Sequence, residues 1–203
     1  METMRGKLSL ELDLDEFVDR LKKYQRVLLD LGTGDGRYVR YLADRNPDAF
    51  IIGVDSCREN LAEHSRAKLN NMLFVIAQAQ ELPHELHGLV SRISINFPWG
   101  SLLESLLHND PLLLNGLSSI ARPGTEMEIY LNAGALTEAG TSLNAGAERI
   151  HENMERHGWK LCVPNTLDAH ALKDFPSTWA RRLAVGRDPR SVQIKGILNG
   201  IRT

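Results

Sequence analysis

The sequence predicts an α/β fold in which a mostly parallel β-sheet is covered by helices and ends in an antiparallel hairpin. Short apolar runs alternate with amphipathic segments along the chain, which is typical of parallel strands joined by helices. The apolar run over 27–31 leads directly into a turn with glycines at positions 32, 34 and 36. The length of 203 residues suits one domain, expected over 1–203, in which residues 1–10 form a small extra β-ribbon.

The first half of the chain has clear start and stop signals for its elements. Asp13, with Glu16 three residues later, forms a capping pattern ahead of a helix. Asn46 and Pro47 end the helix that follows the glycine turn. The expected elements are a helix over 14–23, a strand over 26–31, a helix over 36–45, a strand over 50–54, a helix over 57–69 and a strand over 72–76.

The second half continues the same alternation. Residues 122–124 (RPG) form a turn before the fifth strand, and Gly158 ends a long helix. Pro164 indicates a bulge or an edge in the extended segment 159–167. The segment 191–201 alternates well enough to pair antiparallel with it. The other expected elements are a strand over 92–97, helices over 100–107 and 110–120, a strand over 126–132 and a helix over 143–157.

The composition limits the kinds of partner that the protein can bind and the cellular compartment in which it can work. The net charge of −2 argues against non-specific binding to nucleic acid, although a short C-terminal stretch concentrates basic residues around a single acid, Asp188. The two cysteines form no CxxC motif, and no long apolar run is present. The histidines lack the spacing of a metal site. We therefore expect a cytoplasmic monomer without a metal ion or membrane contact.

The glycine turn indicates a ligand site, because glycine permits positive φ angles and lets a ligand lie against the backbone. A dinucleotide fingerprint has the spacing GxGxxG, whereas this turn has GxGxG with Asp30 ahead of it. Nineteen residues after Gly36, a second apolar run ends in Asp55, whose carboxylate could accept both hydroxyls of a ribose. This pairing suits an adenosine without phosphates. The competing interpretation is a purely structural turn in another α/β protein.

Two loops and one basic segment supply candidates for the remainder of the site, since ligands of open α/β sheets lie beyond the carboxyl ends of the strands. Ala79 and Gln80 follow the third strand, and Gln80 could bond the amino group of an adenine. Trp99 follows the fourth strand, where a core position is the alternative. Trp179 lies among basic residues, in a loop or short helix whose composition is unusual for a core segment. Stacking on a flipped base contributes about 1–3 kcal/mol per base, and two tryptophans would serve that purpose.

Four segments carry a resemblance to a known family: LDLGTGDGR over 29–37, FVIAQAQELP over 74–83, FPWGSLLE over 97–104 and STWARRLAVGR over 177–187. They resemble the aminoglycoside-resistance 16S rRNA (adenine-N1)-methyltransferases, which are Rossmann-like class I enzymes that use S-adenosylmethionine (SAM). The similarity extends over nearly the whole chain, and its last two segments are the most specific. It implies methylation of one adenine at N1 in the decoding site of 16S rRNA within the 30S subunit.

The resemblance also implies roles for individual residues. The adenine would lie between Trp99 and Trp179, with Ser177 supporting them and Asn96 beside the reacting atoms. The residues expected to hold SAM are Asp30, Gly32, Thr33, Gly34, Gly36, Asp55, Ser56, Ala79, Gln80, Asn96 and Ser101. The residues expected to bind RNA are Arg181, Arg182, Arg187 and Arg190.

The chain departs from the family pattern at three places. Gln80 stands where the family commonly has an acid. Asn96 replaces an apolar residue, so that NFPW approaches the NPPY-type motif of enzymes that methylate exocyclic amino groups. The passage AKLNNM over 67–72 is shorter than the basic loop with which the resistance enzymes dock on the ribosome.

Three alternative functions remain open at this point. Asn96 and the carbonyl group of Pro98 could hold an exocyclic amine of another RNA. The acidic balance and the short loop over 67–72 would suit a small-molecule acceptor. The chain could also bind SAM and associate with RNA without catalysing methyl transfer.

Overall fold

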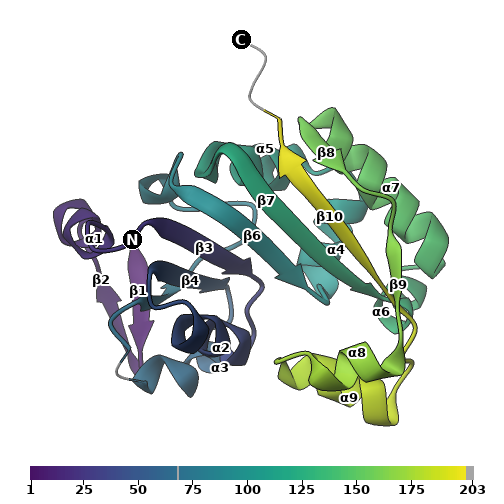
Figure 1. Cartoon of the computed structure of the whole chain (residues 1–203), viewed down its shortest axis with the longest axis horizontal. Coiled ribbons are helices and arrows are strands. Elements are labelled where there is room, and N and C mark those ends of the chain that lie inside the picture. The colour runs from purple at the N-terminus through teal and green to yellow at the C-terminus, as the bar shows by residue number, and fades with distance from the viewer. Residues whose placement is uncertain (68, 200–203) are drawn as a thin grey trace.

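The computed structural model describes residues 1–67 and 69–199, and within them the chain forms a ten-stranded sheet with helices on both faces (Figure 1). Alternate residues of the strands point to opposite faces. Leu29 and Ile52 therefore join the core cluster beneath α4 (Gly100–Leu107), whereas Leu28 and Ile51 join the cluster beneath α2 (Arg37–Arg45). The sheet is thus buried on both faces, as expected for parallel strands joined by helices.

The centre of the sheet confirms the predicted five parallel strands. In chain order these are β3 (Arg26–Leu31), β4 (Ala49–Asp55), β5 (Met72–Ile76), β6 (Val90–Asn96) and β7 (Ala121–Asn132). Their order across the sheet is β5-β4-β3-β6-β7. The chain moves outward from β3 to β5 and then returns to the other side of β3. The switch point for ligand binding therefore lies between β3 and β6, at their carboxyl ends.

Antiparallel strands extend both edges of this parallel centre. A ribbon of β1 (Glu2–Arg5) and β2 (Leu8–Glu11) pairs through β1 with β5. At the other edge, β10 (Ser191–Leu198) pairs antiparallel with β7 and with β8 (Trp159–Leu161), as predicted for the C-terminal hairpin. Pro164 separates β8 from β9 (Asn165–Leu167), which also pairs with β10. Residues 200–201 of the expected last strand lie outside the described residues.

Most helices agree with the sequence prediction to within a few residues. These are α1 (Leu14–Leu21), α2, α4, α5 (Pro111–Ile120) and α7 (Leu143–Arg156). The helices α6 (Ala133–Glu138) and α8 (Ala169–Asp174) were not predicted. The basic segment around Trp179 forms α9 (Thr178–Gly186). No helix within the described ranges is both long and apolar enough to span a bilayer.

The prediction of one helix over 57–69 is wrong. A short α3 (Arg58–Leu61) is followed by the 3-10 turn η1 (His64–Arg66). The irregular path follows from a tertiary contact, because the buried Ser65 accepts a hydrogen bond from the backbone amide of Gly6 in the β1–β2 ribbon at 2.9 Å. The RPG turn before the fifth strand is instead a bulge inside β7, where the register to β6 shifts between Val90 and Arg92.

Helices α8 and α9 pack side by side beyond the carboxyl ends of β6 and β7 (Figure 1). Phe175, between the two helices, attaches them to the sheet. Its ring lies 5.5 Å from that of Phe97 and 4.8 Å from that of Tyr130, centre to centre. Leu172 and Leu183 complete this small apolar cluster. The cluster positions Trp179 over the switch point.

Candidate active site

The glycine turn after β3 adopts the backbone conformation that its composition predicts. Gly32, Gly34 and Gly36 have φ angles of 71°, 57° and 77°, which disfavour residues with a Cβ atom. A Cβ atom at Gly36 would lie 2.4 Å from the ring of Phe74, so Gly36 provides close packing of the turn against β5. A Cβ atom at Gly34 would meet no atom within 4 Å, because this residue faces open space. Gly34 is therefore the position at which a ligand can approach the backbone.

Asp55 is held in place at the end of β4 by two backbone amides. Its Oδ2 accepts from Gly34 and its Oδ1 from Cys57, both at 2.8 Å. Each carboxylate oxygen can accept more than one hydrogen bond. Asp55 therefore joins the glycine turn to the end of β4 and retains acceptor capacity for a pair of ligand hydroxyls.

Asp30, ahead of the turn, is a buried carboxylate held by two neighbouring side chains. It is 1 % exposed and accepts from Ser94 Oγ at 2.9 Å and from Asn96 Nδ2 at 2.6 Å. Burial raises the pKa of Asp30 to about 6, and the hydrogen bonds from Ser94 and Asn96 oppose that rise. A positively charged ligand nearby would favour its ionised form.

One buried acceptor atom beside Asp30, Asn96 Oδ1, lacks a partner among the described residues. Asn96 Nδ2 is already bonded to Asp30, so its Oδ1 remains to receive a donor. Buried polar atoms are normally hydrogen-bonded, and a bound molecule with an N–H or O–H group would satisfy them. The ammonium group of SAM has that chemistry, and the carboxylate of Asp30 complements its charge.

These residues border two adjoining clefts. The main cleft has a volume of about 580 Å³ and runs from Gly34 and Asp55 to Trp99 and Trp179. The second cleft, of about 460 Å³, lies around Asp30, Thr33 and Asn96 and shares Trp179 with the first. Such volumes are typical of sites for small ligands. The predicted cofactor residues on one or both clefts are Asp30, Gly32, Thr33, Gly34, Asp55, Ser56, Ala79, Gln80, Asn96 and Ser101.

Gln80 presents a defined edge of its amide to the main cleft. Its Nε2 donates to Ser105 Oγ at 2.7 Å, and Ser105 Oγ donates to Asp110 Oδ2 at 2.8 Å. A carboxylate only accepts, so Ser105 must donate to Asp110 and accept from Gln80. The carbonyl oxygen Oε1 of Gln80 is left for the cleft, where it can accept from an amino group. Ser105 and Asp110 were not singled out from the sequence.

The two tryptophan rings meet at the mouth of the main cleft. Trp99 and Trp179 have ring centres 5.9 Å apart and planes tilted by 49°. Both side chains are half-buried and line the cleft, so neither is a core residue. The loop that carries Trp99 contains Phe97 at a φ of 53°, which is a strained conformation typical of functional loops. A base between two parallel rings needs centres about 7 Å apart, so the rings must separate by roughly 1 Å and align.

The N-terminus of helix α9 is hydrogen-bonded to the glycine turn. Ser177 caps the helix by accepting from the amide of Ala180 at 3.1 Å. Thr178 Oγ1 donates to Asp35 Oδ2, within the glycine turn, at 2.5 Å. Ser177 thus supports Trp179 through the helix cap, and Thr178 is a residue that the sequence did not reveal. Asn60 and Tyr38 also border the clefts without having been expected there.

The predicted RNA-binding arginines separate into two groups. Arg181, Arg182 and Arg187 lie around a third cleft of about 460 Å³ beside α9, which we call the arginine cleft. Arg37 also lines it and was not expected from the sequence. The guanidinium groups of Arg187 and Arg182 lie 4.8 and 5.7 Å from the ring centre of Trp179. The arginine cleft therefore brings Arg37 of α2 together with three arginines of α9 and its C-terminal end.

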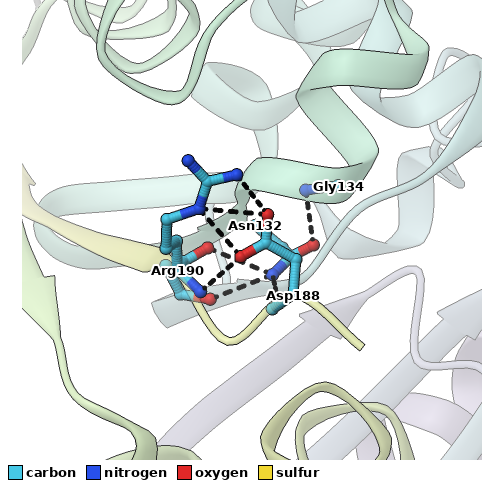
Figure 2. A network of polar contacts seen from close by, with 5 residues as sticks. Asn132, Gly134, Asp188 and Arg190 are labelled. Atoms are coloured by element: carbon cyan, nitrogen blue, oxygen red, sulfur yellow. Dashed lines mark hydrogen bonds and ion pairs between the residues drawn. The ribbon is translucent and has the colours of Figure 1, made fainter. Parts of the chain in front are cut away.

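Arg190 does not line the arginine cleft. Figure 2 shows its guanidinium paired with Asp188, whose pKa is lowered mainly by that hydrogen bonding. Asn132, at the end of β7, donates to the carbonyl groups of Asp188 and Arg190 at 2.8 and 3.1 Å. The Arg190 side chain is exposed, and its expected RNA contact stays a prediction. The described residues contain no cluster of three metal-ligating side chains.

Comparison with known proteins identifies the family of the chain that forms this site. Residues 2–198 match the model of the NpmA family, described as 16S rRNA (adenine(1408)-N(1))-methyltransferase. A protein of that name from Escherichia coli is 31% identical over 97% of this chain and 98% of its own length.

Solved structures agree with this match. The crystal structure of the 16S rRNA methyltransferase KamB is 29% identical, has a TM-score of 0.88 and overlaps 98% of this chain and 100% of its own. A Catenulisporales acidiphilia structure with the cosubstrate SAM, 24% identical over 100% of this chain and 99% of its own, supports the fold with a TM-score of 0.88. This chain belongs to the 16S rRNA (adenine(1408)-N(1))-methyltransferase family.

Proposed function

We propose that this protein transfers a methyl group from SAM to N1 of an adenine in the decoding site of 16S rRNA. The observation that carries the proposal is the meeting of Trp99 and Trp179 at the mouth of a cleft whose inner wall is the glycine turn and Asp55. The proposal includes action as a monomer. We further propose the assembled 30S subunit as substrate and the cytoplasm as the place of action.

The inner part of the two clefts would hold the cofactor. Asp55 would accept the ribose hydroxyls, and Gln80 Oε1 would accept from the adenine amino group. Asp30 and the unpartnered Oδ1 of Asn96 would face the ammonium group. SAM would supply an electrophilic methyl carbon on a positively charged sulfur. Each of these assignments matches a free acceptor of the protein with a donor of the ligand.

The tryptophans would hold the acceptor base once it leaves the RNA stack. Stacking recognises the faces of a base and requires no particular sequence around it. Arg182 and Arg187 already lie near the ring of Trp179, where they can contact the backbone of the same nucleotide. The protein would thereby fix the base in one plane above the cofactor cleft.

The proposed chemistry needs no strong base from the protein. Adenine N1 has an in-plane lone pair and carries no proton that must be removed. Consistent with this, the described residues that line the two clefts include neither histidine nor cysteine. Catalysis would come from positioning, which can lower a barrier by roughly 7–11 kcal/mol. An exocyclic amine, by contrast, must lose a proton after methylation.

The test of the proposal is methyl transfer to purified 30S subunits. Incubation with labelled SAM, followed by primer extension on the 16S rRNA, should show one new strong stop, because an N1-methyl group blocks base pairing. Mass spectrometry of the digested RNA then identifies the methylated atom. A methyl group on the exocyclic nitrogen would replace the N1 proposal with the Asn96 alternative. Tight SAM binding without methyl transfer to 30S subunits or to naked rRNA would support the alternative in which the protein binds SAM but does not catalyse methylation.

Two substitutions separate the acceptor side of the site from the cofactor side. Trp179→Ala should lower methyl transfer at least about 100-fold, because the base loses one stacking face and its orientation, while SAM affinity stays within about threefold. Asp55→Ala should instead abolish measurable SAM binding in titration calorimetry. Retention of normal activity by Trp179→Ala would refute the stacking model.

A further inference from the structure

Arg37 begins α2 directly after the glycine turn, but its side chain belongs to a different surface. It lines the arginine cleft together with Thr178, Arg181, Arg182, Val185 and Arg187. It does not border either of the two clefts assigned to the cofactor. The arginine cleft therefore combines one cation from the turn after β3 with three from α9 and its C-terminal end.

No acid pairs with the arginines of this cleft in the part of the chain that the structure describes. Ion pairs within the described residues use other arginines: Arg20, Arg26, Arg40, Arg58, Arg92, Arg156 and Arg190. Asp35, two residues before Arg37, accepts from Thr178 Oγ1 and from the backbone amide of Arg37, and it forms no ion pair with an arginine within the described residues. Arg37 Nε is buried and has no hydrogen-bond partner among the described residues. Arg37 thus has no anionic partner in the described part of the chain, and its guanidinium keeps donors for a ligand.

The chemistry of the cleft fits a phosphate group. Planar guanidinium groups bind phosphate oxygens through paired, charge-assisted hydrogen bonds. Val185, which is 78 % exposed, adds an apolar side chain at this cleft that the sugar of a nucleotide can contact. Arg182 and Arg187 connect the cleft to the ring of Trp179 at 5.7 and 4.8 Å.

We propose that Arg37, together with Arg181, Arg182 and Arg187, binds a backbone phosphate of the RNA beside the nucleotide that stacks on Trp179. This inference rests on the proposed function. It assigns an RNA contact to a residue of the cofactor-binding turn, so one turn serves both ligands. The bond between Thr178 and Asp35 holds the two parts of the phosphate site together.

The test compares Arg37→Gln with Arg40→Gln, a matched control. Arg40 lies on the same helix, is exposed and faces Asp44 at 4.0 Å, away from the arginine cleft. Binding to purified 30S subunits is measured by filter retention over a series of KCl concentrations. We expect Arg37→Gln to weaken binding about tenfold and to reduce the slope of log affinity against log salt by about one. Arg40→Gln should match the unchanged protein in both.

A second substitution and two further measurements make the outcome decisive. Arg37→Lys keeps the charge and should retain the salt slope while losing part of the affinity. SAM affinity by calorimetry and the melting temperature should be unchanged in all variants. Equal binding by Arg37→Gln and Arg40→Gln would overturn the inference, and so would a loss of SAM affinity in Arg37→Gln with an unchanged salt slope. Failure of the unsubstituted protein to bind and methylate 30S subunits would refute the proposed function itself.

Discussion

At the scale of single residues, Ser105 governs how the cofactor cleft would recognise adenine. Its hydroxyl group donates to Asp110 and must therefore accept from Gln80, which leaves the carbonyl oxygen of Gln80 to accept from a ligand in the cleft that Gln80 lines. A glutamine can thus replace an acid at this position, because its amide is held in the orientation that presents an acceptor. Neither Ser105 nor Asp110 touches the cofactor cleft, so both are positioning residues.

Ser105→Ala should change which base the cleft prefers. Without the hydroxyl group, the Gln80 amide can rotate and present its donor. The unchanged protein should bind S-adenosylhomocysteine at least about tenfold more tightly than S-inosylhomocysteine, whose 6-oxo group is an acceptor. In Ser105→Ala the ratio of the two affinities should fall to about threefold or less. Calorimetry with both ligands measures it.

Ser118→Ala is the matched control, because Ser118 bonds to the backbone of α5 away from the cleft. It should keep the preference of the unchanged protein. The same preference in Ser105→Ala would contradict the assigned orientation of Gln80.

At the scale of elements, helix α9 depends on contacts that are distant in the sequence. Thr178 bonds to Asp35 in the glycine turn, and Phe175 packs against β6 and β7 through Phe97 and Tyr130. The sequence left a loop or a short helix open for this segment, because it contains several exposed basic residues. The structure forms a helix there, since Ser177 supplies a cap and the apolar cluster supplies a surface.

Thr178→Val should separate the position of Trp179 from cofactor binding. Valine keeps the shape of threonine but cannot donate to Asp35, so α9 loses its bond to the glycine turn. A hydrogen bond to a charged group contributes about 1.5–3 kcal/mol, which predicts roughly a tenfold loss in kcat for 30S methylation. SAM affinity should change less than about threefold. Thr166→Val on the exposed strand β9 is the control, and equal activity of the two variants would argue against this bond as the determinant.

At the scale of the whole molecule, the switch point brings the carboxyl ends of β3, β4 and β6 together around a buried charge. Asp30 is covered by the sheet on either side, and the hydrogen bonds from Ser94 and Asn96 cross from β6 to β3. The fold therefore keeps a carboxylate where its ionisation is unfavourable unless a cation is bound nearby. The buried carboxylate of Asp30 therefore lowers the stability of the ligand-free protein and raises its affinity for a cationic ligand.

Asp30 should make stability depend on pH between about 4 and 6. Its pKa is raised to about 6, whereas an unfolded aspartate has a value of 3.8, so the folded protein binds the proton more strongly in that window. The free energy of unfolding should fall by about 3 kcal/mol as pH rises through the window. Asp30→Asn should lack this decline, and SAM should remove it from the unchanged protein by favouring the ionised form.

Urea unfolding of both proteins from about pH 4 to about pH 7 measures the difference, because all other titrating groups are shared. Calorimetry over the same range should show SAM affinity rising with pH in the unchanged protein only. Parallel stability curves for the two proteins would disprove the effect of Asp30.

The sequence alone determined the presence of five parallel strands, the glycine turn and the two tryptophans as candidates, because each depends on local patterns. Short apolar runs indicate buried strands, and positive φ angles favour glycine where the chain turns this sharply. The tertiary structure decided the break after α3, the placement of Arg37 in the arginine cleft and the orientation of Gln80 by Ser105. These features arise where segments far apart in the chain meet, and no local pattern encodes the direction in which a side chain finds its partner.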